Sequence, residues 1–142
     1  MTDLSRILSA KTPLTLSGVP SGFLPVLLAD LARAAKGRVC FVAPDAQMAG
    51  AIAQTVHYFA PELALVQIPA WDCLPYDRAS PSLRAASGRV AGLHALQAEP
   101  KGPQLILTTI NAVTQRTLTP FRVRQMVARL APGERIAIDR LI

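Results

Sequence analysis

The stretch that decides the fold is Val39-Cys40-Phe41-Val42-Ala43-Pro44-Asp45. Residues 39–43 are all apolar, as in a strand covered on both faces of a sheet, so Cys40 is expected to be a small buried side chain. Pro44 ends the strand because it cannot donate to a strand ladder, and Asp45 is placed to cap a following helix. A buried strand that leads directly into a helix is the repeating unit of an α/β protein.

The same alternation continues on both sides of this stretch. Strands are expected at residues 14–17, 39–43, 65–68 and 105–109, and less clearly at 126–130; helices are expected at 21–35, from Asp45 to Pro61, from Ser80-Pro81 to about 96, and from Asn111 to about 118. The spacing of apolar residues predicts which helix faces are buried. These faces consist of Leu24, Leu27, Leu28, Leu31 and Ala35 in the first helix, Met48, Ile52, Val56 and Phe59 in the second, and Leu83, Ala86, Val90, Leu93 and Leu96 in the third, where Arg84, Ser87 and Arg89 fall away from the apolar stripe. The predicted fold is α/β, with an open, mostly parallel sheet and helices on both faces.

Composition agrees with one ordinary folded domain. The chain has 142 residues, of which 51% are hydrophobic and 17% charged, so it has ample core-forming material. No apolar run is long enough to span a membrane and no secretory signal is recognisable. Cys40 and Cys73 are too few and too far apart for a zinc site, and a reducing cytoplasm is the simplest compartment.

The net charge of +6 is unevenly distributed. Residues 71–142 carry ten basic and five acidic groups, against five and four in residues 1–70. Arg116, Arg122, Arg124 and Arg129 follow one another with no acidic residue between them, and such a run can attract phosphate backbones. A solvated basic surface is the favoured interpretation, and the aromatic residues Trp71, Tyr76 and Phe121 are too scattered to form a platform that stacks bases.

The first strand-to-helix turn is where a parallel α/β sheet would bind a nucleotide. A phosphate-binding loop there needs a glycine, a lysine and a hydroxyl at fixed spacing after Gly18. Phe23, Leu24 and Pro25 occupy those positions, and Gly22 is out of register, so the loop is degenerate and no nucleotide site is predicted. No catalytic residue, metal ligand set or cofactor of this chain is predicted either.

The loop over residues 69–81 is the other unusual segment. It holds three prolines and the only tryptophan, Trp71, which favours a stiff structural loop. Asp72 and Asp77 could form a carboxylate pair, but a structural role is favoured because the sequence shows no pocket or partner for them.

This loop carries a resemblance to a known family. Trp71, Asp72, Leu74, Pro75, Tyr76 and Asp77, followed by Ser80-Pro81, closely resemble the N-terminal region of the bacterial transcription-repair coupling factors (Mfd). Residues 42–45, Ser87-Gly88-Arg89, the strand at 105–109 and Gln115-Arg116 follow in that family's order. The resemblance implies a first domain like that of the repair protein UvrB, at residues 1–130, with residues 131–142 beginning a UvrA-docking subdomain whose first helix Asp139 would cap.

The resemblance also implies a function. The parent would be an ATP-dependent DNA translocase that displaces stalled RNA polymerase and recruits UvrA, with ATP and magnesium bound in motor domains beyond Ile142. This chain would be an N-terminal, non-catalytic part of it, with UvrA, RNA polymerase and DNA as partners of the parent. The alternative is a small nucleic-acid-binding or nucleotide-dependent α/β protein unrelated to repair.

Overall fold

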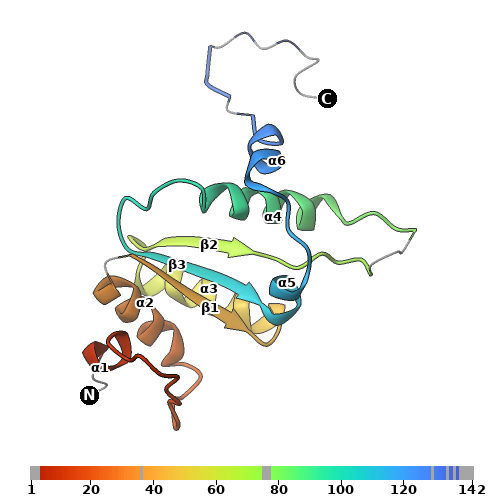
Figure 1. The fold of residues 1–142 in the computed structure, drawn as a ribbon. Coiled ribbons are helices and arrows are strands. Elements are labelled where there is room, and N and C mark those ends of the chain that lie inside the picture. Colours follow the sequence, from red (N-terminus) through yellow and green to blue (C-terminus); the bar gives the residue numbers. More distant parts are fainter. Residues whose placement is uncertain are drawn as a thin grey trace.

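The computed structural model describes residues 4–35, 37–74, 78–128, 130–133, 135 and 137. Its elements, in chain order, are α1 (Leu4–Leu8), α2 (Leu24–Ala35), β1 (Arg38–Ala43), α3 (Ala46–Phe59), β2 (Ala64–Ile68), α4 (Leu83–Ala95), β3 (Gln104–Thr109), α5 (Ile110–Thr114) and α6 (Pro120–Gln125). The strands form one parallel sheet in the order β1-β3-β2 (Figure 1). The predicted α/β class with a parallel sheet is confirmed.

Strand β3 is the centre of the sheet. It pairs with β1 from Arg38↔Gln104 to Ala43↔Thr109, and with β2 from Ala64↔Gln104 to Ile68↔Thr108. All six of its residues are buried. Strand β3 is the last strand in the sequence but lies between the two earlier ones. Because a central strand is covered on both faces and both edges, its residues do not alternate between apolar and polar side chains.

Helices α2 and α3 cover one face of the sheet. Their leucine and isoleucine side chains pack on Leu105 and Leu107 of β3, which are 0% and 2% exposed. Within this layer, Leu28 of α2 and Ile52 and Val56 of α3 are buried, as their spacing predicts. Asp45 caps α3 as predicted, because its carboxylate accepts a hydrogen bond of 2.7 Å from the Met48 N–H.

Helix α4 lies on the opposite face and contacts β2, which confirms helices on both faces (Figure 1). Its buried side matches the predicted stripe only in part. Val90 is buried as predicted, but Leu83 is 88% exposed, and Ala85, Arg89 and Gly92 are buried as well. A Cβ added to Gly92 would lie 2.3 Å from the Gln67 carbonyl oxygen, so the helix approaches β2 through small residues.

The predicted strand at residues 14–17 is wrong. These residues form no strand, and Leu14 and Leu16 are each 45% exposed. A strand of four residues has little stability unless a neighbour pairs with it, and neither edge of the sheet does so in the described part of the chain. The expected strand at 126–130 is also missing from its described residues, while the short helix α1 and the turn at 21–23, which delays α2 to Leu24, were not predicted.

The predicted burial was too extensive for two elements. Strand β1 was expected to be covered on both faces of the sheet, and Phe59 was expected on the buried face of α3. Strand β1 is an edge strand, and Cys40 and Val42 are exposed on the face that α4 leaves uncovered. Phe59 is 61% exposed and makes an edge-to-face contact with Tyr58, whose ring centroid is 5.0 Å away. The apolar pattern is the same in a central and an edge strand, so strand order was needed to tell them apart.

The proposed domain boundary at residue 130 stays a prediction, since Glu134 and Asp139 lie outside the described residues.

The close approach of α4 gives a matched pair of substitutions. Gly92→Ala should destabilise the protein by about 1–3 kcal/mol because the new methyl group overlaps a strand carbonyl. Gly50→Ala, on α3, meets nothing within 4 Å and should be neutral or stabilising by up to about 1 kcal/mol. Urea unfolding of the two variants measures the difference, and equal midpoints would contradict this helix-to-strand packing.

Candidate functional site

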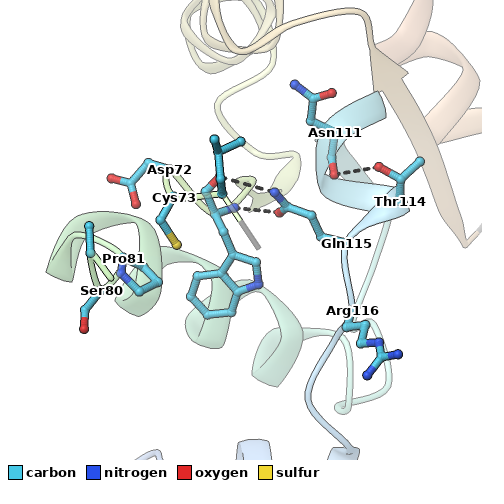
Figure 2. A pocket seen from close by; sticks show the side chains of 11 residues that line it. Asp72, Cys73, Ser80, Pro81, Asn111, Thr114, Gln115 and Arg116 are labelled. Carbon is cyan, nitrogen blue, oxygen red and sulfur yellow. Dashed lines mark hydrogen bonds between the residues drawn. The ribbon is translucent and has the colours of Figure 1, made fainter. Parts of the chain in front are cut away.

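The candidate site lies at the carboxyl ends of β2 and β3. After β2 the chain enters the loop at residues 69–82, and after β3 it passes directly into α5, because the Thr109 hydroxyl accepts a hydrogen bond of 3.2 Å from the Ala112 N–H. The two segments face each other across an open groove of about 1120 Å³. Figure 2 shows Asp72, Ser80 and Pro81 on one side of it, with Asn111, Thr114, Gln115 and Arg116 on the other.

Gln115 joins the two sides. Its side-chain amide accepts a hydrogen bond from the Trp71 N–H (2.7 Å) and donates one to the Trp71 carbonyl (3.3 Å), as the dashed lines in Figure 2 show. A side-chain amide can thus satisfy both backbone groups of one residue, as a neighbouring strand would. The position of Trp71 therefore depends on a residue 44 positions later in the chain.

Arg89 of α4 contacts the same region through its buried side chain. Its side chain is among the largest that are fully buried, with 1% exposure, and it donates hydrogen bonds to the carbonyls of Pro69 (2.8 Å), Ala112 (3.1 Å) and Gln115 (3.4 Å). Its guanidinium carbon lies 5.3 Å from the centre of the Trp71 ring, in a cation–π arrangement. Burial lowers the pKa of Arg89, but an arginine remains charged in proteins.

The ends of the loop are also tied together. Asp72 accepts a hydrogen bond of 3.0 Å from the Ser82 N–H, and Ser82 caps α4 by accepting one of 3.2 Å from the Ala85 N–H. Hydrogen bonding to Ser82 lowers the pKa of the Asp72 carboxyl, with the larger effect from the Ser82 side chain and the smaller from its backbone. The predicted helix start at Ser80-Pro81 is therefore two residues too early.

Arg89 is the residue that sequence reasoning placed wrongly. The prediction placed it away from the apolar stripe of α4, because the helical spacing of Leu83, Ala86, Val90, Leu93 and Leu96 was taken to mark the buried side. The overlooked signal is the recurrence of small residues at Ala85, Gly88 and Gly92, which indicates the face of closest approach. Arg89 follows Gly88 on that face, and a Cβ on Gly88 would lie 3.3 Å from the Pro69 ring.

The predicted residues of the tryptophan loop differ in their exposure to solvent. Trp71 is half-buried, Leu74 is 75% exposed, and Pro75, Tyr76 and Asp77 lie outside the described residues. Because Asp77 is among these, the carboxylate pair with Asp72 stays an untested interpretation.

The degenerate loop was expected at a strand-to-helix turn, and that expectation is wrong. Gly18 has a φ of +71° and Gly22 lies in a turn, but no strand precedes them from residue 4 onward. Phe23 is 44% exposed, Leu24 packs on the core, and Pro25 is buried in the first turn of α2. The first turn of α2 therefore contributes to core packing.

The predicted basic surface is divided between elements. Arg116 lines the groove, Arg122 and Arg124 are exposed on α6, and Arg129 lies outside the described residues. Residues two apart on a helix do not share a face, so Arg122 and Arg124 point in different directions. In the described residues no group of three or more His, Cys, Asp or Glu could hold a metal ion, and no described helix is long and apolar enough to cross a membrane.

Known proteins resemble this chain over most of its length. It is 30% identical to the transcription-repair-coupling factor of Myxococcus xanthus over 123 residues, which is 81% of the chain. It is 25% identical to that of Haemophilus influenzae over 126 residues (89%), and 26% identical to that of Escherichia coli K12 over 115 residues (81%).

This chain is a relative of the transcription-repair-coupling factors. It spans only about a tenth of their length, since the matches cover 11%, 10% and 10% of the three proteins. No family model matches the chain, and no solved structure does. Two segments that carry the family resemblance are the tryptophan loop and Ser87-Gly88-Arg89. In this structure they contact each other through the Arg89 side chain.

The buried guanidinium gives a second matched pair. Arg89→Lys should destabilise the protein by at least about 2 kcal/mol, because an ammonium group cannot reach all three carbonyls and each buried carbonyl left without a donor costs about 1–3 kcal/mol. Arg84→Lys, on the exposed side of α4, should change stability by less than about 0.5 kcal/mol. Thermal unfolding followed by Trp71 fluorescence measures both, and an unchanged midpoint for Arg89→Lys would contradict the clamp.

Proposed function

We propose that this chain is a non-catalytic, UvrB-like module of a transcription-repair coupling factor. The observation that carries the proposal is the match to three such proteins over 81–89% of the chain. The fold supports it, since a parallel α/β sheet with helices on both faces is the architecture that the resemblance implies. In this role the chain contributes to DNA repair as one folded part of a larger protein.

The finer part of the proposal concerns the parent protein. That protein would use ATP and magnesium in its motor domains to move along DNA and displace stalled RNA polymerase, and would recruit UvrA for nucleotide excision repair. The contribution of this chain would be structural. The packing of its own residues supports this assignment, because the side chains at the phosphate-loop position, Leu24 and Pro25, lie on the core side of α2.

The residues of the tryptophan loop also favour a structural module over an enzyme. Trp71 is held through its backbone by Gln115, and Arg89 is occupied by three carbonyl groups. Arg89 is therefore committed to hydrogen bonds within the fold.

The chain should not bind ATP. Leucine and proline in the first turn of α2 provide neither a charge for the phosphates nor a hydroxyl for magnesium, and Pro25 also lacks a backbone N–H. Isothermal titration with magnesium and ATP should give only dilution heats, while a phosphate-loop protein in the same buffer serves as the positive control. A one-to-one site of micromolar affinity would favour the alternative, a nucleotide-dependent α/β protein.

The chain alone should bind UvrA weakly or not at all. The proposed docking subdomain has only residues 131–142 here, and isolated helices shorter than about 12 residues are marginal in water. Exposed arginines such as Arg122 and Arg124 would steer an encounter more than they would anchor a complex. A version of the protein extended by one subdomain beyond Ile142 should bind, as interferometry at physiological salt would measure. Equal affinity of both versions would place the docking surface within this chain and contradict the assignment.

A further inference from the structure

The two edges of the sheet are treated differently by the fold. Helix α4 lies against the β2 edge, since a Cβ added to Gly92 would come within 2.3 Å of the Gln67 carbonyl oxygen. Strand β1 forms the other edge, and no strand pairs with its outer side in the described part of the chain (Figure 1). An edge with unpaired backbone N–H and C=O groups is a template for another strand, and proteins usually cover or protect it.

The ladder between β1 and β3 shows which backbone groups of β1 point outward. The Gln104 N–H donates a hydrogen bond of 3.1 Å to the Gly37 carbonyl, so Gly37 faces β3. In a parallel ladder every second residue of a strand directs both its backbone groups to the same neighbour, and the register is unbroken along β1. The N–H and C=O groups of Arg38, Cys40 and Val42 therefore point to the open edge.

This open edge lacks the features that keep an edge strand unpaired. Residues 39–43 contain no charged residue and no proline, and the continuous register with β3 leaves no place for a bulge. Arg38 is the one charged residue of β1, and its guanidinium donates hydrogen bonds within the fold, to the Gln104 side-chain oxygen (2.8 Å) and to the Ala98 carbonyl. The strand is therefore apolar along the edge and accessible to another strand.

The edge is complementary to a second copy of itself. Across a two-fold axis two β1 strands run antiparallel, and each outward-facing residue exchanges both backbone hydrogen bonds with the residue opposite it. With the axis at Cys40, the two Cys40 residues lie opposite each other, and Arg38 of each copy lies opposite Val42 of the other. No like charges meet in this register, and it uses every outward-facing group of both strands. A shift toward the carboxyl end would place Arg38 opposite Pro44, which has no N–H to donate.

We propose that this chain forms a weak symmetric dimer in which two β1 edges pair and join the two sheets into one. A single strand buries much less than the roughly 800 Å² per partner of a standard interface, so the dissociation constant is on the order of 0.1–1 mM. The net charge of +6 on each copy opposes association, and added salt should therefore strengthen the dimer. The inference does not depend on the proposed function, so its failure would leave the coupling-factor assignment untouched.

NMR spectra of the whole chain at increasing concentration test the pairing residue by residue. Between about 20 µM and about 2 mM, the N–H protons of Cys40 and Val42 should move downfield along one saturable dimerisation curve, because they become hydrogen-bonded. The N–H protons of Leu65 and Gln67, which occupy the outward-facing positions of the covered edge strand β2, should not move. Sedimentation velocity over the same concentrations should show a monomer–dimer equilibrium that shifts toward dimer in higher salt.

Two lysine substitutions, one at each edge, form a matched pair. Val42→Lys places a positive charge opposite Arg38 of the second copy and should weaken the dimer about tenfold. Gln67→Lys adds the same charge to the other edge strand and should leave the dissociation constant within about twofold. Both side chains are exposed, so both variants should fold, as circular dichroism can verify.

Val42→Glu tests the register, because it places a carboxylate opposite Arg38 of the second copy. This variant should dimerise at least as tightly as the unchanged chain. A monomer at every concentration, which would leave the edge to a strand of another protein, would overturn the proposal. Concentration-dependent shifts at Leu65 and Gln67, equal weakening by the two lysines, or a Val42→Glu variant as weak as Val42→Lys would overturn it as well.

Discussion

The buried guanidinium of Arg89 is the interaction on which the carboxyl end of the sheet depends. It is 1% exposed, and its Nη1 and Nη2 donate hydrogen bonds to the backbone carbonyls of Pro69, Ala112 and Gln115, whereas its buried Nε has no hydrogen-bond partner. Taking a charge out of water is costly, and that cost is offset only where hydrogen-bond acceptors are already in place. The loop after β2 and the end of α5 are therefore held relative to each other by one side chain of α4.

This clamp requires α4 to lie close to the sheet. Gly88 and Gly92 allow the approach, because a Cβ at either position would press on the Pro69 ring or on the β2 backbone. With larger residues there, the helix axis would move outward and Arg89 would no longer reach the carbonyls. The small residues of α4, the buried charge and the position of Trp71 thus form one connected arrangement, in which the glycines supply the space and the arginine supplies the bonds.

The same arrangement ties Trp71 to two other segments of the chain. Its backbone groups bond to Gln115 and its ring lies against the guanidinium of Arg89, whereas Leu74 is 75% exposed. In the parallel α/β architecture, the carboxyl ends of the strands are the usual position of a functional site. Here that position carries the tryptophan loop, while the first turn of α2, with Leu24 packed on the core, serves the helix layer.

The sequence by itself determined the local structure and its class. Apolar runs such as residues 105–107 and breaks at Pro44 and Pro61 predicted the strands and helices of the α/β pattern, because these signals depend on a residue and its immediate neighbours. The departure from a phosphate-binding loop at Leu24 and Pro25 could be recognised for the same reason, since that motif has fixed spacing.

Only the tertiary structure decided which side chains are buried at the site. Strand order made β3 central and left Cys40 exposed on the edge strand β1, although both strands read alike. The small residues of α4 indicate the face on which Arg89 lies, but they do not show that a charge can be buried there, because its acceptors lie 20 positions before it and 23 and 26 positions after it. A charge is assigned to the surface by its neighbours in sequence, but whether its burial can be offset depends on carbonyls that folding brings from elsewhere in the chain.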